Sequence, residues 1–469
     1  MEKYPFIPVA KSIQEKKGQT SLRNAHIVAV DAELKPIIPI LEEEFALLIG
    51  SGLERQDEEI VKIELIIDGT LREEQMKLTI GRHIVVQGGS YSAVAGGTVL
   101  LLQLATDAGE VPNCIIEDEP DLPYRGLMLD LARHWHSIDC VKKAIELCRF
   151  YRLSHLQLHL SDDQSFTFPL TCFPNIATPG RHYTRQLLDE LVEFAHQRGI
   201  ELVPEIDLPG HSEILNRSEP ELFTSGIGGE HENAICLGNA AVYEAVEQIM
   251  SELCEVFKYS RHIHLGCDET KMSIFEQCPT CRERMKELEV TSAEGLLRSF
   301  IVRAAEMVER NGRKPIVWEG FSPEPGIEIP KDITVVAWES YYHSADELAA
   351  AGYPLINASW QPLYVTPNAG WSPEHIYGWN VRRWEHWWEK SKAHLSPIQL
   401  DKSANVIGAQ FCSWENEEEN VLDLLRLRVP TMVERIWNEE RKIRWEQFSE
   451  RLDRLDIKAM RLVEGIIRD

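Results

Sequence analysis

The sequence predicts an α/β protein, a (β/α)8 TIM barrel that follows a small α/β domain of mixed sheet and helices. Short apolar runs alternate with helical patterns through most of the chain, as expected for parallel strands joined by crossover helices. Several of these runs end in ionisable residues, which predicts a catalytic face at the carboxyl ends of the strands. The 469 residues exceed one average domain, and a barrel with insertions accounts for well over half of them.

The first part of the chain, residues 1–118, is predicted to be a separate noncatalytic α/β domain. Its strand-like runs are 26–30, 61–67, 76–80 and 84–87, with helical segments near 34–49 and 91–107. Gly88-Gly89-Ser90 is interpreted as a structural turn, because it has neither a P-loop lysine nor GxGxxG spacing. The acidic, proline-bearing segment 117–123 is predicted to be a linker, so the catalytic domain is placed at 119–469 with a C-terminal helix.

Eight strand candidates follow the linker. They are 124–130, 155–160, 202–207, the run from His262, 314–318, 334–338, 354–358 and 406–411. Amphipathic patterns fit between them, for example at 139–151, 184–198 and 292–311. A closed parallel barrel is the most economical arrangement of such elements.

Asp268 and Glu269 end the apolar alternation that starts at His262. Two neighbouring carboxylates at a strand end perturb each other's protonation, which is one way to make a catalytic acid. An ordinary solvated pair is the alternative, but three other strands also end in ionisable residues: Asp130 to His134, Asp162-Asp163, and Asp207 with His211. Adjacent side chains on a strand point to opposite faces, so both acids serve one site only if the backbone bends there.

Tryptophans also gather at strand ends. Trp318, Trp338 and Trp414 would give a pocket flat apolar walls, which suit the C–H faces of a pyranose ring or a small methyl group. Six of the twelve tryptophans fall between Trp360 and Trp388. Because Trp384 and Trp388 are four residues apart, a helix face packed on the barrel is favoured over extra sugar subsites.

The ten cysteines lie mostly in apolar runs, as expected for reduced thiols in a cytoplasm. Cys278 and Cys281 form the one close pair, which could be half of a zinc site. No second pair or histidine pair follows at metal spacing, so an incidental or structural role is favoured. We therefore expect no metal and no cofactor.

The formal charge of −26, from 75 acidic and 49 basic residues, argues against nucleic acid or an anionic membrane surface as partner. No run of eighteen apolar residues occurs, and the first residues lack the apolar core of a secretory signal. A cytoplasmic location is expected, or a secreted one if a leader was removed. The expected partner is a small glycan or glycoside, and a homodimer is left open.

These motifs resemble the family 20 glycoside hydrolases, the β-N-acetylhexosaminidases, over nearly the whole chain. His264-Leu265-Gly266-Cys267-Asp268-Glu269 is similar to that family's H-x-G-G-D-E signature, with Cys267 at the second glycine. The other matching blocks, in order, are Tyr124-Arg125-Gly126 with Asp130 and Arg133-His134, His159 to Gln164, Glu205 to His211, and Trp414 ahead of Val433 to Trp437. The first domain resembles the noncatalytic domain that precedes the barrel in this family.

The resemblance implies an exo-acting, retaining enzyme that removes terminal β-linked GlcNAc or GalNAc by substrate-assisted catalysis. The substrate's 2-acetamido oxygen attacks the anomeric carbon and forms an oxazolinium intermediate, so no enzyme nucleophile is needed. Glu269 would protonate the leaving oxygen and later deprotonate water, which requires a pKa raised toward the working pH. Asp268 would hydrogen-bond the acetamido N–H and stabilise the positive charge of the intermediate.

The resemblance also assigns the supporting residues. Arg125 would grip the sugar's 3- and 4-hydroxyls, for which its forked donor is suited, with an ion pair at the barrel bottom as the alternative. Asp162, Asp163 and His211 would tune Glu269, and Tyr364 would bond the acetamido oxygen. Trp318, Trp338 and Trp414 would enclose the acetamido methyl.

Two departures from the family pattern leave the GlcNAc or GalNAc preference open. Thr366 stands where the family usually has Asp or Asn. The usual Trp-x-Glu becomes Trp414-Glu415-Asn416-Glu417, so the carboxylate that contacts the 4- and 6-hydroxyls is Glu415 or Glu417, or is absent.

Two other functions remain as alternatives. A conventional two-carboxylate glycosidase would use Glu319 or Glu339 as nucleophile, at about 5 to 5.5 Å from Glu269. A noncatalytic sugar-binding barrel is disfavoured by the intact Asp268-Glu269 pair.

Overall fold

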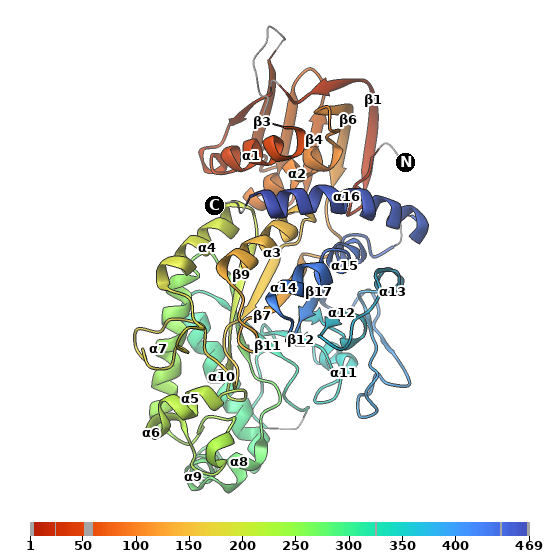
Figure 1. Cartoon of the computed structure of the whole chain (residues 1–469). Helices are drawn as coiled ribbons and strands as arrows, with labels where there is room; N and C mark the ends of the chain where they lie inside the picture. Colours follow the sequence, from red (N-terminus) through yellow and green to blue (C-terminus); the bar gives the residue numbers. More distant parts are fainter. Residues whose placement is uncertain (1–3, 24, 51–59, 324–325, 441–442, 467–469) are drawn as a thin grey trace.

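The computed structural model describes residues 4–23, 25–50, 60–323, 326–440 and 443–466. Two β-structures dominate it: a six-stranded sheet at the amino-terminal end and a barrel that follows (Figure 1). The sheet ends with Asp118 and the first barrel strand begins at Tyr124. Among the described residues, no helix is both long and apolar enough to cross a membrane.

The first sheet is mixed. Its strand order is β1-β6-β4-β5-β3-β2, with parallel pairing of β2 to β3 and of β3 to β5. The strands are β1 (Ser12–Ser21), β2 (Ala25–Ala29), β3 (Val61–Ile67), β4 (Met76–Ile80), β5 (Ile84–Gly88) and β6 (Glu110–Asp118). Helices α1 (Ile37–Ile49) and α2 (Tyr91–Leu104) accompany the sheet, and Ser90 caps α2 by accepting a hydrogen bond from the Ala93 N–H.

Strands β1 and β6 were not predicted. β1 is an edge strand with mostly exposed side chains, so it lacks the apolar alternation by which a strand is recognised. β6 contains Pro112, and its acidic end was interpreted as the start of the linker. β6 pairs with both β4 and the largely polar β1, and this pairing accounts for the β-structure of both unpredicted strands.

The predicted (β/α)8 barrel is confirmed. Its strands are β7 (Tyr124–Asp130), β8 (His155–His159), β9 (Glu201–Leu208), β10 (His262–Gly266), β11 (Lys314–Trp318), β12 (Thr334–Ala337), β13 (Leu355–Asn357) and β17 (Val406–Ser413). All neighbours pair in parallel, and pairing of β17 with both β13 and β7 closes the barrel. A short strand, β14 (Tyr364–Val365), adds to the carboxyl end of β17 and so brings Tyr364 to that face.

Helices surround the barrel because each has one apolar face. They include α3 (Ile138–Phe150), α4 (Arg185–Gln197), α7 (Ala240–Val256), α10 (Ala293–Arg310), α11 (Ala345–Ala350), α14 (Glu418–Leu425) and α15 (Arg428–Trp437). Further helices lie in the connections: α5 (Glu213–Ser218), α6 (Pro220–Phe223), α8 (Met272–Gln277), α9 (Pro279–Glu287), α12 (Trp360–Leu363) and α13 (Pro373–Gly378). Each buried Leu or Phe on such a face contributes about 1.5 to 3 kcal/mol relative to exposure.

The C-terminal helix α16 (Trp445–Gly465) packs against α3 of the barrel and α1 of the first domain (Figure 1). Its buried side chains, among them Phe448 and Leu455, join an apolar core that also includes Phe45 and Phe150. The helix therefore connects the two domains through continuous hydrophobic packing.

The helix predicted from Trp384 and Trp388 is wrong. Trp384 lies in β15 (Arg383–Trp384), which pairs with β16 (Ile398–Gln399), and the following residues form turns. The Trp384 ring is nevertheless buried, and its Nε1–H donates to the Ala337 carbonyl at 2.9 Å. The four-residue spacing matched a helix by coincidence. A strand of two residues is too short to show a strand periodicity in the sequence.

Candidate active site

A cavity of about 270 Å³ opens at the carboxyl ends of the barrel strands. Its lining combines charged and aromatic side chains: Arg133, Asp268, Glu269, Trp318, Trp338, Glu339, Trp360, Tyr364, Thr366, Trp414 and Glu415. This is the face on which (β/α)8 barrels carry their active sites. The volume suits one small ring rather than an extended ligand.

The backbone bends where the sequence required it. Gly266, Cys267 and Glu269 have φ of 72°, 78° and 43°, in the left-handed region that side chains other than glycine rarely adopt. Gly266 permits the bend, because a Cβ there would lie 1.7 Å from Oδ1 of Asp207. The turn brings both Asp268 and Glu269 to the lining of the cavity.

Asp268 is the more deeply placed of the two acids. Burial raises the pKa of its carboxyl, the Glu269 charge adds to that, and the nearby His211 opposes it. Its Oδ1 is buried and has no hydrogen-bond partner within the described chain. A buried acceptor without a donor is costly, so this atom is prepared to receive an N–H or O–H from a ligand.

A chain of side chains connects Glu269 to the barrel interior. His211 lies between two carboxylates, with Nδ1 3.3 Å from Oδ1 of Asp162 and Nε2 3.4 Å from Oε2 of Glu269. His159 continues the chain, since its Nε2 lies 3.0 Å from Asp162 and its Nδ1 lies 2.7 Å from Glu205. Each imidazole thus contacts a carboxylate with both nitrogens, an arrangement that favours the doubly protonated ring.

The electrostatics follow from this alternation of charge. Burial disfavours the imidazolium of His211, but Asp207, Asp162 and Glu269 outweigh it and raise its pKa well above the ordinary value. Burial likewise acts to raise the pKa of Asp162, but hydrogen bonds from His159 and His211 and the charge of Arg133 hold it well below its usual range.

The expected increase in the pKa of Glu269 is not found. The His211 ring, whose Nε2 lies 3.4 Å from Oε2 of Glu269, lowers the pKa of Glu269 more than burial raises it. The side chain is 48% exposed, so water still stabilises its anion. A ligand that covers Glu269 would remove that water and shift the pKa upward, toward the protonated form that a general acid needs.

Aromatic side chains form the opposite walls. Trp318 is fixed by its Nε1–H, which donates to Oε1 of Glu205 at 2.6 Å, and Trp338 by donation to the Glu319 carbonyl at 3.1 Å. Trp338 stacks parallel to Tyr364 at 6.1 Å between centroids, and Trp414 lies 6.3 Å from Tyr364. The structure therefore brings together the predicted aromatic residues around one apolar space.

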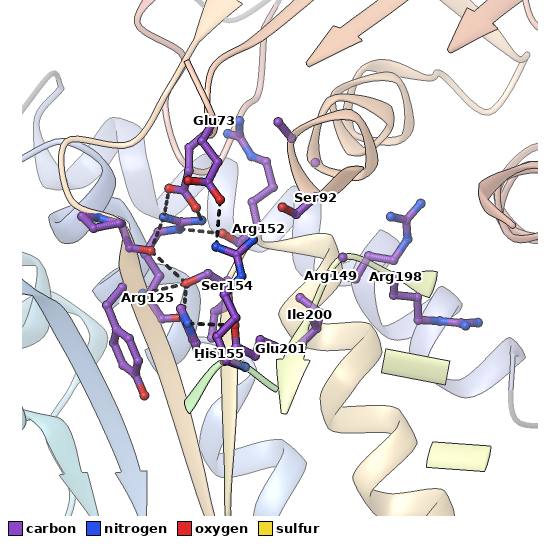
Figure 2. Close-up of a pocket in the computed structure, with 18 of the residues that line it drawn as sticks. Glu73, Ser92, Arg125, Arg149, Arg152, Ser154, His155, Arg198, Ile200 and Glu201 are labelled. Carbon is purple, nitrogen blue, oxygen red and sulfur yellow. Dashed lines mark hydrogen bonds and ion pairs between the residues drawn. The ribbon is translucent and has the colours of Figure 1, made fainter. Parts of the chain in front are cut away.

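Arg125 lies at the wrong end of the barrel for the role assigned to it. It is the second residue of β7, and its guanidinium pairs with Glu74 at 2.7 Å and donates to the carbonyls of Arg152, Leu122 and Pro123. It lines a separate pocket of about 310 Å³, where the first domain meets the amino-terminal ends of the strands. Figure 2 shows Arg125 among the residues of this pocket. The barrel-bottom ion pair, the alternative interpretation, is correct, because parallel strands carry their first residues to the bottom.

Arg133 occupies the position that Arg125 was expected to hold. It follows β7 at the cavity, pairs with Asp162 at 2.8 Å and lies 4.9 Å above the Trp414 ring. Its nearest other acids are Asp130 at 3.5 Å and Glu415 at 3.9 Å. Its place after the strand, rather than at the start of it, is the sequence signal that distinguishes it from Arg125.

The remaining predicted residues divide between cavity and support. Glu415 lines the cavity with a 57% exposed side chain, whereas Glu417 contacts His134 at 3.2 Å and is not part of the lining. Asp163 accepts a hydrogen bond from the Glu213 N–H at 2.9 Å and does not contact His211. Of the two adjacent aspartates, only Asp162 touches the histidine.

Sequence reasoning missed His159 and Glu205 as site residues. Glu205 accepts from Trp318, Gln157 and His159, and it lies 3.1 Å from His264, so it fixes several residues below the cavity. Both residues lie inside the family's motif blocks. The alternation of side chains along a strand does not reveal which inward-facing polar residues from different strands will meet.

The two candidate nucleophiles of the alternative mechanism behave differently. Glu319 is fully buried, and its carboxylate accepts backbone N–H groups from Ser340 to His343, which makes it a structural residue. Glu339 lines the cavity, and burial and the charge of Glu269 raise its pKa to about 8. A carboxyl that is protonated near neutral pH is a poor nucleophile.

An acid pair with one buried member, Asp268, together with an aromatic enclosure and an arginine at the carboxyl face, defines this protein as a barrel with a carboxylate-based site. Residues 122–440 match the family model for the glycosyl hydrolase family 20 catalytic domain. The chain therefore belongs to glycosyl hydrolase family 20.

Curated relatives are named β-hexosaminidases. That of Akkermansia muciniphila is 29% identical over 348 residues, covering 67% of this chain and 70% of the relative. That of Vibrio furnissii is 27% identical over 345 residues, covering 66% of this chain and 56% of the relative. The chain thus spans less than two thirds of the length of the latter, as it does for relatives from Entamoeba histolytica and Porphyromonas gingivalis, at 61% and 57%.

Solved structures share the fold. An exo β-N-acetylglucosaminidase from Vibrio harveyi in complex with N-acetylglucosamine has a TM-score of 0.81 at 23% identity, covering 98% of this chain and 78% of that one. A family 20 β-N-acetylhexosaminidase from Streptomyces coelicolor has a TM-score of 0.78 at 22% identity, covering 100% and 97%.

Proposed function

We propose that this chain is an exo-acting, retaining β-N-acetylhexosaminidase that removes terminal β-linked GlcNAc or GalNAc by substrate-assisted catalysis. The observation that carries the proposal is the buried, unpartnered Oδ1 of Asp268 in a cavity walled by Trp318, Trp338, Tyr364 and Trp414. An acetamido group offers an N–H for that oxygen and a methyl for those rings. The names of the curated relatives support the same activity.

The reaction uses two acids in different roles. Glu269 gives its proton to the glycosidic oxygen while the acetamido oxygen bonds to the anomeric carbon and the leaving alcohol departs. Asp268 accepts the acetamido N–H, orients the amide and stabilises the positive oxazolinium. Water then attacks the anomeric carbon and passes its proton to Glu269, which restores the acetamido group with retained configuration.

Arg133 and Glu415 are two charged groups of the cavity lining that suit the sugar hydroxyls. The guanidinium fork of Arg133 suits two adjacent hydroxyls, and the exposed carboxylate of Glu415 lies on the same side of the cavity, 3.9 Å from it. We assign both to recognition of the non-reducing end.

Turnover of three p-nitrophenyl glycosides tests the proposal: the N-acetyl-β-glucosaminide, the N-acetyl-β-galactosaminide and the plain β-glucoside. We expect turnover of one or both acetamido sugars and none of the glucoside. A thiazoline mimic of the cyclic intermediate should bind far more tightly than GlcNAc, because the site is complementary to the transition state. Equal inhibition by thiazoline and free sugar contradicts substrate participation.

Two variants separate this mechanism from the two-carboxylate alternative. Glu269→Gln should remove most activity on substrates with poor leaving groups. Azide should not rescue this variant through a glycosyl intermediate on a second carboxylate. Glu339→Gln should keep turnover of the acetamido sugars, because no glycosyl ester forms on Glu339. Loss of turnover in this variant, together with trapping of a glycosyl ester on Glu339 of the wild-type chain, supports the alternative. Glu244→Gln, on the exposed face of α7, is the matched control.

A further inference from the structure

We propose that Cys236, Cys278 and Cys281 form a three-thiolate zinc site that links the two loops carrying His211 and Glu269. The sequence showed only Cys278 and Cys281 as a pair. The fold adds Cys236, which lies 42 residues before Cys278. The inference concerns a site outside the catalytic cavity and is independent of the proposed activity.

The spacing of the sulfurs matches tetrahedral coordination. The Cys236 sulfur lies 3.8 Å from the sulfur of Cys278 and 3.8 Å from that of Cys281. A tetrahedral zinc ion with bonds of about 2.3 Å separates its sulfur ligands by about 3.8 Å. A disulfide would need about 2.05 Å, so none of these pairs is one.

The backbone around the sulfurs favours thiolates. Cys278 is the N-cap of α9, and its sulfur accepts the Cys281 N–H at 3.4 Å. Cys236 precedes α7, whose N-cap is Asn239. Negative charge is stabilised at the amino-terminal ends of helices, and two such ends meet at this cluster.

The two loops are packed too closely for an ordinary contact between surface loops. A Cβ on Gly238 would lie 2.4 Å from the Cys281 nitrogen and 2.3 Å from the Thr280 carbonyl carbon, so only glycine fits. The three cysteines are no more than 3% exposed. Among described residues, no other His, Cys, Asp or Glu ligand atom completes the group, so the fourth ligand is assigned to water.

The position of the cluster between two active-site loops indicates a structural role for the metal. The loop after β9 carries His211 and continues through Cys236 to α7, while the loop after β10 carries Glu269 and continues through Cys278 and Cys281 to α10. A zinc ion would cross-link the two loops that supply the 3.4 Å contact between His211 and Glu269. The three cysteines are therefore positioning residues for that contact.

Metal analysis of the full-length chain, purified without chelator, tests the proposal. We expect about one zinc ion per chain by mass spectrometry, with loss of that ion in Cys236→Ser and in Cys278→Ser. Cys254→Ser is the matched control, because Cys254 is a buried cysteine on α7 outside the cluster. It should keep its zinc. Retention of zinc by both cluster variants overturns the proposal.

Cobalt replacement in the wild-type chain supplies a test that does not depend on variants folding. After zinc removal, Co²⁺ should give sulfur-to-metal charge transfer and intense tetrahedral ligand-field bands. Cobalt spectra of an octahedral aqueous ion, without sulfur-to-metal charge transfer, refute the site. Chelation of the zinc should lower the melting temperature and increase hydrogen exchange in residues 270–292, whatever substrate the enzyme uses.

Discussion

Replacing His211 with asparagine should shift the basic limb of the pH profile to higher pH. The substitution suits the backbone, because His211 has a φ of 46° and asparagine tolerates the left-handed region. It removes the positive charge that lowers the pKa of Glu269. Without that charge the Glu269 carboxyl keeps its proton to a higher pH, so general-acid activity persists further into the alkaline range.

The magnitude follows from the separation of the two groups. Opposite unit charges at 3.4 Å attract by about 1 kcal/mol in bulk water and by about 5 kcal/mol at an effective dielectric constant of about 20. Because the Glu269 side chain is 48% exposed, the lower end applies, about 1 to 2 kcal/mol. One pKa unit corresponds to about 1.4 kcal/mol, so the expected shift is about one pH unit.

The assay is the pH dependence of kcat/KM, which reports the pKa values of the free enzyme. The substrate should be N,N′-diacetylchitobiose, because its alcohol leaving group needs a proton, unlike nitrophenolate. His182→Asn is the control, since that exposed ring contacts only the Thr178 carbonyl among its described hydrogen bonds. A basic limb that stays in place or moves to lower pH would refute the electrostatic reasoning.

Asp268→Asn should lower kcat by about 10²- to 10³-fold, which steady-state kinetics measures. The melting temperature should change little in thermal unfolding, because a neutral isostere replaces a buried carboxyl of raised pKa. Arg133→Lys should lower kcat/KM by about 10- to 100-fold through loss of the guanidinium fork. Arg125→Lys should lower the melting temperature with kcat/KM unchanged, since its pair with Glu74 lies at the other end of the barrel. Trp338→Ala should weaken a thiazoline inhibitor about 10- to 100-fold, measured as Ki, because about 1.5 to 3 kcal/mol of apolar burial is lost. Equal effects of the two arginine variants on kcat/KM, or unchanged inhibition of the tryptophan variant, would contradict these assignments.

Local pattern was sufficient for most of the barrel and for the acid pair. The eight strands were recognisable because their residues face a barrel interior or a helix layer, so apolar runs mark them. The edge strand β1 was not recognisable, since its side chains remain in water. Asp268 and Glu269 were found because a pair of acids at a strand end interrupts an apolar run.

Arg125 and Arg133 show how a motif can be right and a residue within it wrong. Arg125 lies at the start of β7 and Arg133 follows its end, and the resemblance alone did not separate them. Position along β7 does, because residue 125 enters the barrel at the bottom and residue 133 leaves it at the top. The direction of the predicted strand already places Arg125 at the bottom of the barrel and Arg133 at the top, so the sequence contained the information that the assignment of Arg125 to the sugar did not use.

By itself, the amino-acid order determined the elements, their alternation and the chemistry at each strand end, because hydrophobic periodicity and motif spacing are properties of neighbouring residues. Tertiary structure alone decided the link from Glu205 through His159, Asp162 and His211 to Glu269, and the meeting of Cys236 with Cys278 and Cys281. Such contacts join separate strands and loops, and only closure of the barrel brings them within bonding distance. The pKa of Glu269 depends on the same closure, since its charge partner lies 58 residues away in the chain.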